Sequence, residues 1–117
     1  MTKEEMQYKI YYEIIVDCYE DHEVNMGWFY FFQDEVNYPF EAEIAVKNRA
    51  GKKKLVKVEV LDVSNEEGFD NGGIAFEVNL QEENITIDVD IAKLKNIKGD
   101  NTTQEAFEIW QYWKTGM

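Results

Sequence analysis

Carboxylates are the side chains whose number and spacing in this sequence could do chemistry. The first 43 residues hold eleven Asp and Glu against two Lys, whereas the remainder holds thirteen acidic against ten basic side chains. A field of this sign repels nucleic-acid phosphates and attracts cations. We therefore expect a cation-binding protein without a nucleic-acid partner. In the alternative interpretation, the acidic residues only solvate the surface.

Asp34 is the first candidate ligand, because it lies close to the end of an expected helix. Pro39 pushes the residue before it out of the α region, so this helix must end by Asn37. The backbone carbonyls freed there are oxygen ligands, and the negative end of the helix dipole favours a cation. Glu41 follows the turn at Pro39, and we expect it to assist Asp34.

Glu13 and Asp17 form a second candidate site. They lie four residues apart on an expected helix over residues 4–20, and this spacing makes their carboxylates neighbours. Lys9 could already neutralise Glu13, which would leave only a solvated face. If the two helices pack as a tight antiparallel hairpin, Asp34 lies about three turns from Asp17, too far for one ion to contact both.

The second expected helix has a broad apolar face and a distinct polar side. The apolar face consists of Val24, Trp28, Phe31, Phe32 and Val36. Asp34 lies off this face, next to the side that carries Glu23, Gly27 and Tyr30. Either Asp21 or Asn25 would cap the start of the helix, because each side chain can accept from free backbone N–H groups.

From Phe40 onward the hydrophobic pattern has the period of two that is typical of half-buried strands. We expect strands over residues 40–46, 55–63, 74–80 and 84–91, with the longest loop over residues 65–73. Thr102 and Glu105 have the spacing of a capping box, which predicts a last helix. The predicted fold is α+β: an amino-terminal helical hairpin, a curved antiparallel sheet of four or five strands or an SH3-like barrel, and a closing helix. Residues 1–117 are expected to form a single domain.

Several functional classes are disfavoured by composition. The single cysteine, Cys18, cannot form an internal disulfide, which favours a reducing cytoplasm. We expect no membrane partner, because the sequence has no apolar run long enough to span a bilayer and no secretion signal. We also expect no enzyme, because no nucleophile has a suitable base and no Gly-rich loop has phosphate-binding spacing.

Three segments together resemble one known family. Met26-Gly27-Trp28, Tyr30, Asp34, Val36 and Tyr38-Pro39-Phe40 resemble the signature of small acidic calcium-binding proteins typified by the cyanobacterial protein CcbP. Upstream, Glu13–Tyr19 is similar to the family's acidic-Ile-Val-Val-Asp-Ala-Tyr segment, with Cys18 in place of Ala. Near the end, Thr103-Gln104-Glu105-Ala106 and Trp110-Gln111-Tyr112-Trp113 are similar to the closing helix of the family.

This resemblance implies Ca²⁺ as the bound ion and a role as a calcium buffer or sensor. Calcium takes six to eight oxygen ligands, so carboxylates from separated segments would suit it. The candidate ligands are Asp34, Glu41, Glu13 and Asp17, with Asp34 ranked first because it lies inside the best-matched motif. The alternative is a protein-interaction module with an SH3-like barrel and no metal, for which Tyr12, Tyr30 and Tyr112 could supply the binding face.

Overall fold

The computed structural model describes residues 1–64, 74–81 and 83–115. These residues form two compact units, one from Met1–Asn37 with Asp100–Met117 and one from Tyr38–Gly99. The loop predicted over residues 65–73 lies outside the described residues, and the single domain over residues 1–117 stays a prediction.

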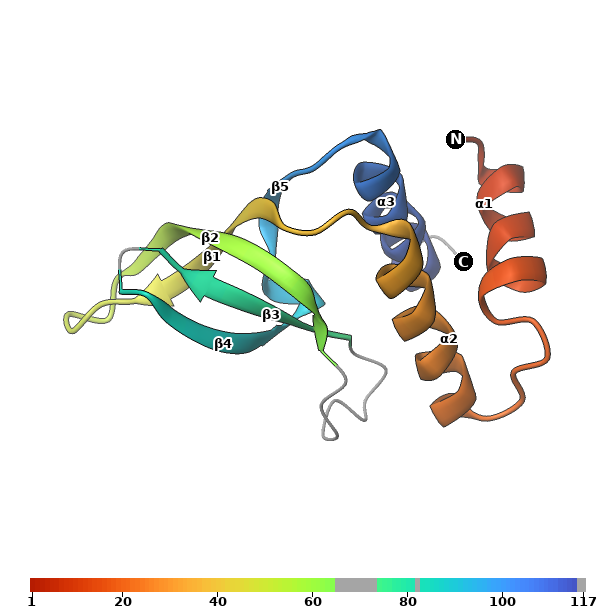
Figure 1. The fold of residues 1–117 in the computed structure, drawn as a ribbon, viewed down its shortest axis with the longest axis horizontal. Helices are drawn as coiled ribbons and strands as arrows, with labels where there is room; N and C mark the ends of the chain where they lie inside the picture. The colour runs from red at the N-terminus through yellow and green to blue at the C-terminus, as the bar shows by residue number, and fades with distance from the viewer. Residues whose placement is uncertain (65–73, 82, 116–117) are drawn as a thin grey trace. The chain divides into compact units, whose positions relative to one another are not determined.

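The first unit is helical (Figure 1). It contains α1 (Lys3–Lys9), the π-helix η1 (Ile10–Ile14), α2 (Asp21–Glu35) and α3 (Asn101–Thr115). Its core is aromatic, because Trp28 is completely buried and its ring lies edge-on to that of Trp110, with 5.0 Å between the centroids. Phe32, Ile10 and Ile109 complete this core with at most 1% of their surface exposed. Burial of side chains of this size holds α2 against η1 and α3.

The amino-terminal helix is shorter than predicted. Helical structure ends at Ile14 rather than near residue 20, after one turn in which the N–H of Ile15 donates to the carbonyl of Ile10 at 2.9 Å. The β-branched run that begins at Ile14 weakens a helix. Asp17 then adopts a left-handed conformation, with φ of 59°. A long helix over residues 4–20 was therefore a wrong prediction.

The second helix ends where Pro39 predicts and starts differently. Val36 has an extended backbone directly after α2, and the peptide bond between Tyr38 and Pro39 is cis. Glu20 occupies the N-cap position without a side-chain hydrogen bond. The prediction that Asp21 or Asn25 caps this helix was wrong, because both lie within it.

The last helix starts at Asn101, and its first turn is capped by Asp100. The Asp100 carboxylate accepts from the backbone N–H of Thr103 at 2.8 Å and from the side chain of Asn37. The predicted capping box, with Thr102 as the N-cap residue and Glu105 as its partner, was therefore wrong, because the capping residue is Asp100, two positions earlier. The Thr103 backbone, then the side chains of Asn37 and Thr103, lower the pKa of Asp100.

The second unit is a curved antiparallel sheet (Figure 1). Its strands are β1 (Phe40–Lys47), β2 (Lys53–Ser64), β3 (Ala75–Leu80), β4 (Ile85–Asp90) and β5 (Lys95–Lys98), with a 3₁₀ turn, η2 (Ile91–Lys93), before β5. The strand order is β4-β3-β2-β1-β5. The α+β class and the curved antiparallel sheet are confirmed. The strand β5 was not predicted individually.

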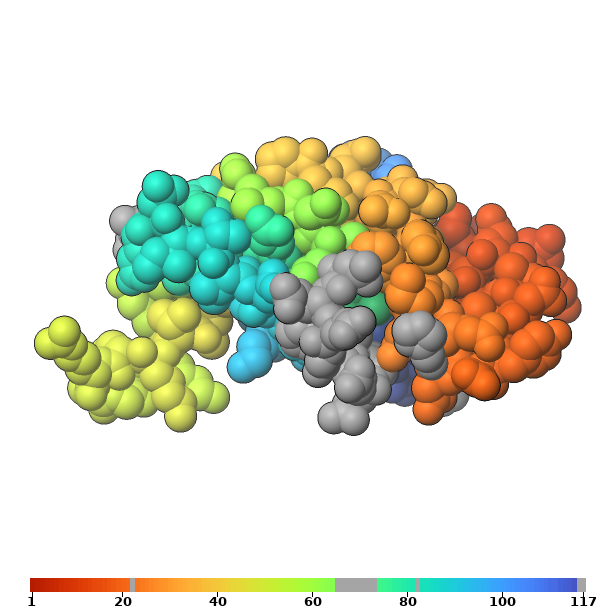
Figure 2. All heavy atoms as spheres, turned by 60° about the horizontal axis from the view of Figure 1, so that its bottom comes forward, coloured from red at the N-terminus to blue at the C-terminus, as the bar shows by residue number. Residues whose placement is uncertain are grey.

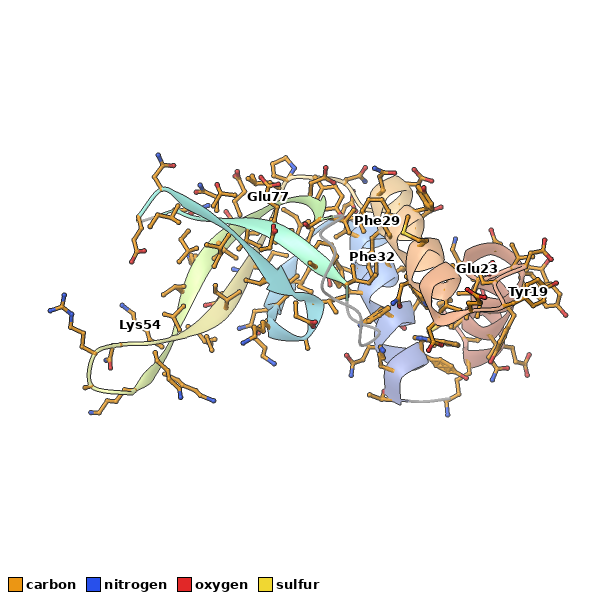
Figure 3. All side chains as sticks on the ribbon, turned by 90° about the horizontal axis from the view of Figure 1, so that it is seen from below. Tyr19, Glu23, Phe29, Phe32, Lys54 and Glu77 are labelled. Carbon is orange, nitrogen blue, oxygen red and sulfur yellow. The ribbon has the colours of Figure 1, made fainter. Side chains whose placement is uncertain are left out.

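The sheet has its own apolar core and a basic hairpin. Val58, Val60, Phe76 and Val78 are completely buried. The β1–β2 turn is organised by Asn48, whose side-chain oxygen accepts from the N–H groups of Ala50 and Lys52. Residues 47–57 carry six basic side chains and no acidic one: Lys47, Arg49, Lys52, Lys53, Lys54 and Lys57. This hairpin, coloured yellow to light green, extends away from the rest of the sheet (Figure 2), and Lys54 is labelled on it in Figure 3.

Candidate functional site

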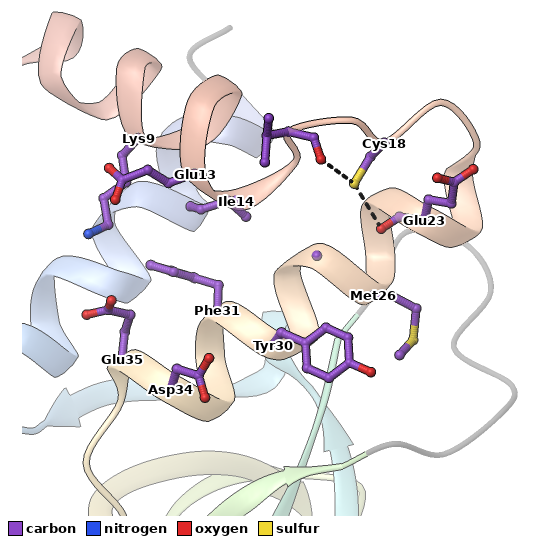
Figure 4. Close-up of a pocket in the computed structure, with 12 residues that line it drawn as sticks. Lys9, Glu13, Ile14, Cys18, Glu23, Met26, Tyr30, Phe31, Asp34 and Glu35 are labelled. Carbon is purple, nitrogen blue, oxygen red and sulfur yellow. Dashed lines mark hydrogen bonds between the residues drawn. The ribbon is translucent and has the colours of Figure 1, made fainter.

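The helical unit contains a pocket of about 680 Å³ between α2 and the segment before it (Figure 4). A single stretch of the sequence supplies all of its lining. The lining residues are Lys9, Glu13, Ile14, Val16, Cys18, Glu23, Met26, Gly27, Tyr30, Phe31, Asp34 and Glu35. Four of them are carboxylates and one is an ammonium, so the pocket has a net negative charge.

One wall of the pocket is a stripe along α2. Glu23, Gly27, Tyr30 and Asp34 follow one another at spacings of four, three and four residues, so they share one side of the helix. This is the side on which the sequence placed Asp34. Tyr30 keeps 53% of its surface exposed, and its hydroxyl points away from Asp34 (Figure 4). The Asp34 carboxylate is exposed close to the end of α2.

The opposite wall comes from the end of α1 and from η1. Glu13 is exposed on η1, and Lys9 closes α1 one turn earlier. The Lys9 ammonium lies 5.9 Å from the centroid of the Phe31 ring, a cation–π distance. In Figure 4 the Lys9 side chain extends toward the space between Glu13 and Glu35. The two walls thus place negative side chains from separate helices and one lysine in the same pocket.

Close backbone packing at Gly27 holds the two walls together. A β-carbon added at Gly27 would lie 2.5 Å from the carbonyl oxygen of Ile14, closer than any real contact. Only glycine therefore permits this approach of α2 to the end of η1. The position of Glu13 relative to α2 depends on this contact, because Glu13 directly precedes Ile14.

Cys18 also lines the pocket, and its thiol is hydrogen bonded. It donates to the carbonyl oxygens of Glu23 and Val16, at sulfur-to-oxygen distances of 3.4 and 3.6 Å (Figure 4). Burial raises the pKa of Cys18, and the carboxylates of Glu23 and Asp17 raise it further. The thiol therefore stays protonated near neutral pH and links the turn to the start of α2, as a structural donor.

The structure brings together two of the four predicted ligands. Asp34 and Glu13 line the same pocket, although the sequence assigned them to separate sites. Asp17 is exposed in the turn after η1 and is not among the lining residues. Glu41 is exposed on β1, where it pairs with Glu59 on one side and Lys98 on the other. It belongs to the other unit.

Glu23 and Glu35 were not predicted as site residues. Both had a visible signal, because Glu23 shares the helical side of Asp34 and Glu35 interrupts an apolar face. A charged side chain within an apolar face must be paired or reach solvent. Glu35 lines the pocket and is half-buried.

The donor set of this pocket suits a hard cation. Carboxylate oxygens prevail over two sulfur atoms, those of Cys18 and Met26. The Cys18 thiol is protonated and hydrogen bonded, and a hard cation does not favour the Met26 thioether. Among the described residues, no group of three or more His, Cys, Asp or Glu side chains is close enough to hold one metal ion. Carboxylates from this pocket alone therefore leave a hard cation dependent on water and backbone carbonyls for part of its coordination.

Comparison with known proteins agrees with this chemistry. A family model described as calcium binding, that of the CcbP proteins, matches residues 8–114. The crystal structure of CcbP from Anabaena is similar over 97% of this chain and 92% of that one, with 28% identity and a TM-score of 0.84. A structure described as a calcium-binding protein in the calcium-binding form is similar over 99% and 97% of the two chains, with 27% identity and a TM-score of 0.79.

No curated protein sequence matches this chain. Within the described part of the chain, none of the helices is both long enough and apolar enough to cross a membrane.

Proposed function

This chain belongs to the CcbP family of calcium-binding proteins, whose model spans most of it, and from that premise we propose that it binds Ca²⁺ in the pocket of the helical unit. The observation that carries this proposal is the meeting of Asp34 from α2 and Glu13 from η1 in one cavity. Both are exposed carboxylates, and calcium coordinates such oxygens readily. The related structure in its calcium-binding form supports the same ion for this chain.

We assign Asp34 and Glu13 as the anionic ligands, with Glu35 as a third acid that lines the same pocket. Water and backbone carbonyls would supply the remaining ligands, and a pocket of about 680 Å³ has room for a hydrated ion. Asp17 and Glu41, which lie outside the pocket, would act only through the general negative field. The role is binding rather than catalysis, and a single unpaired cysteine favours a cytoplasmic location.

We further propose a sensor rather than a buffer. Asp34 and Glu13 line the same pocket from two different elements, α2 and η1. A calcium ion bound by both carboxylates would link α2 to η1, which would couple binding to the relative position of the two elements.

The test is calorimetric titration of the chelator-stripped protein with calcium and with magnesium. Asp34→Asn keeps the shape and one oxygen while removing the charge, so it should weaken calcium binding at least about tenfold, or about 1.4 kcal/mol. Glu20→Gln is the matched control, because Glu20 is exposed and lies outside the pocket. Glu41→Gln should resemble this control.

The result that contradicts the assignment is equally specific. If Asp34→Asn lowers the stability of the calcium-free protein and leaves calcium affinity unchanged, Asp34 is structural. If Glu41→Gln weakens binding as strongly as Asp34→Asn, the site extends beyond the pocket. Equal melting temperatures with chelator, calcium and magnesium at matched ionic strength would exclude a specific calcium site.

A second function, as a protein-interaction module, is favoured by the exposed tyrosines of the helical unit. Tyr12 exposes 66% of its surface and Tyr19 exposes 84%. Tyr112 is less available, because its hydroxyl accepts from the side-chain amide of Gln7 at 2.9 Å. A module that uses these tyrosines alone would bind its partner with the same affinity in calcium and in chelator.

A further inference from the structure

We infer that Lys9 is a built-in competitor of calcium, a tethered cation that sets the calcium concentration at which the pocket fills. This inference rests on the proposed function, because it concerns the same pocket. It adds a regulatory residue that is itself no ligand, since an ammonium has no lone pair to offer. Lys9 acts through its charge.

The geometry places the Lys9 charge among the acids of the pocket. Lys9 lines the pocket together with Glu13, Asp34 and Glu35, and it also lines a second, smaller pocket with Glu4 and Glu13. Its side chain extends toward the space between the carboxylates of Glu13 and Glu35 (Figure 4). The ammonium thus belongs to the same pocket as the negative charges of the two walls.

The position of Lys9 is held by packing as well as by charge. The residue is half-buried, and its ammonium lies 5.9 Å from the centroid of the buried Phe31 ring. The methylene stem of a lysine packs on such apolar surface while its ammonium reaches toward water. Lys9 is therefore a localised counter-cation rather than a freely moving surface charge.

A fixed positive charge must weaken the binding of a divalent cation nearby. A unit charge about 6 Å from a divalent ion, in water-like surroundings at moderate ionic strength, changes affinity by about three- to tenfold. In the absence of calcium the same charge has the opposite effect, because it relieves repulsion among Glu13, Asp34 and Glu35. Lys9 therefore stabilises the empty pocket and opposes the filled one.

The test compares variants that differ only in charge. Lys9→Met keeps most of the apolar stem and removes the charge, and Lys9→Arg keeps the charge. Lys3→Met is the matched control, because Lys3 is exposed on the same helix and lines neither pocket. Each chelator-stripped protein is titrated with calcium by calorimetry and melted with and without calcium.

Lys9→Met should bind calcium about three- to tenfold more tightly than the unsubstituted protein, whereas Lys9→Arg and Lys3→Met should stay within about twofold. In chelator, Lys9→Met should also have a lower melting temperature than the unsubstituted protein. Addition of calcium should raise the melting temperature of Lys9→Met by more than it raises that of the unsubstituted protein. Unchanged or weaker calcium binding by a folded Lys9→Met protein overturns the inference and leaves the proposed function intact. If the unsubstituted protein and Lys9→Met both fail to bind calcium, the proposed function itself fails.

Discussion

Asp100 shows how a single exposed carboxylate can fix the start of a helix. The Asp100 carboxylate accepts a hydrogen bond from the backbone N–H of Thr103 at 2.8 Å. It accepts a second hydrogen bond from the side-chain amide of Asn37, which lies two residues after the end of α2. The N–H of Asn37 donates in turn to the hydroxyl of Thr103 at 3.2 Å. These hydrogen bonds join the two chain segments of the helical unit, one ending at Asn37 and the other beginning at Asp100, across more than sixty residues of sequence.

This linkage predicts a pH dependence with a definite sign. Hydrogen bonds lower the pKa of Asp100 in the folded state, so the ionised form stabilises the fold above the ordinary pKa of an aspartate. This contribution is lost as the pH falls through the lowered value. Asp100→Ala should therefore lower the melting temperature at pH 7. The difference in melting temperature between this variant and the unsubstituted protein should become smaller in acid.

Thermal unfolding between pH 7 and the most acidic pH at which the fold survives measures this effect. Asp88→Ala is a suitable control, since Asp88 is exposed in the middle of β4. A difference for Asp100→Ala that stays constant or widens as the pH falls would contradict a stabilising role for the ionised carboxylate.

At the residue scale, part of the site could be predicted from the sequence. Asp34 and its helical neighbours Glu23 and Tyr30 share a side because of their spacing, which is a local property. The meeting of Glu13 with Asp34 could not be predicted, because it depends on where the first helix ends and how η1 packs on α2. The sequence therefore placed Glu13 and Asp34 in separate sites.

At the scale of elements, the contact between Gly27 and Ile14 decides the packing of α2. A β-carbon at Gly27 would meet a backbone oxygen at 2.5 Å, and backbone cannot rotate away as a flexible side chain would. Gly27→Ala gains helix propensity of up to about 1 kcal/mol. The overlap should outweigh that gain and destabilise the protein by about 1–3 kcal/mol.

Chemical denaturation checks this prediction, with Gln33→Ala as the control in the same helix. Gln33 is exposed, so its replacement should change stability by no more than about 0.5 kcal/mol. Gly27→Ala should also weaken calcium binding, because it moves η1 and with it Glu13. A stabilised Gly27→Ala protein would show that the contact at Ile14 yields at little cost.

Some element ends could be predicted from local sequence signals, and others could not. Pro39 ends the second helix within two residues of its expected end, and the period of two located β1 to β4. The end of the first helix was missed because its apolar periodicity continues past the β-branched run at Ile14 that weakens it. The cap of α3 was missed because Thr102 and Glu105 imitate a motif that Asp100 supplies.

At the scale of the molecule, the candidate calcium pocket belongs to only one of the two units. All the residues that line the pocket fall between Lys9 and Glu35, within the helical unit, while the sheet has a separate buried core. The switch between helical and strand periodicity predicted which residues are helical and which form the sheet, whereas residues 1–117 were expected to form a single domain. The charge balance predicted a cation as the ligand and indicated the acidic third of the chain that contains the pocket. Neither signal could predict that Glu13 and Asp34 line the same pocket, because this depends on how the helical unit folds.

The basic hairpin, residues 47–57, should affect how the protein binds to ion-exchange resins. The chain has a net charge of −12, yet residues 47–57 contain six of its twelve basic side chains and no acidic one. A charged resin interacts with the surface that faces it, because charges beyond about 10 Å are screened at moderate salt. At pH 7 the protein should therefore be retained on a cation exchanger as well as on an anion exchanger. Replacing Lys52, Lys53 and Lys54 by Gln should abolish retention on the cation exchanger, whereas the same change at the exposed Lys3, Lys93 and Lys98 gives an identical net charge and should preserve it.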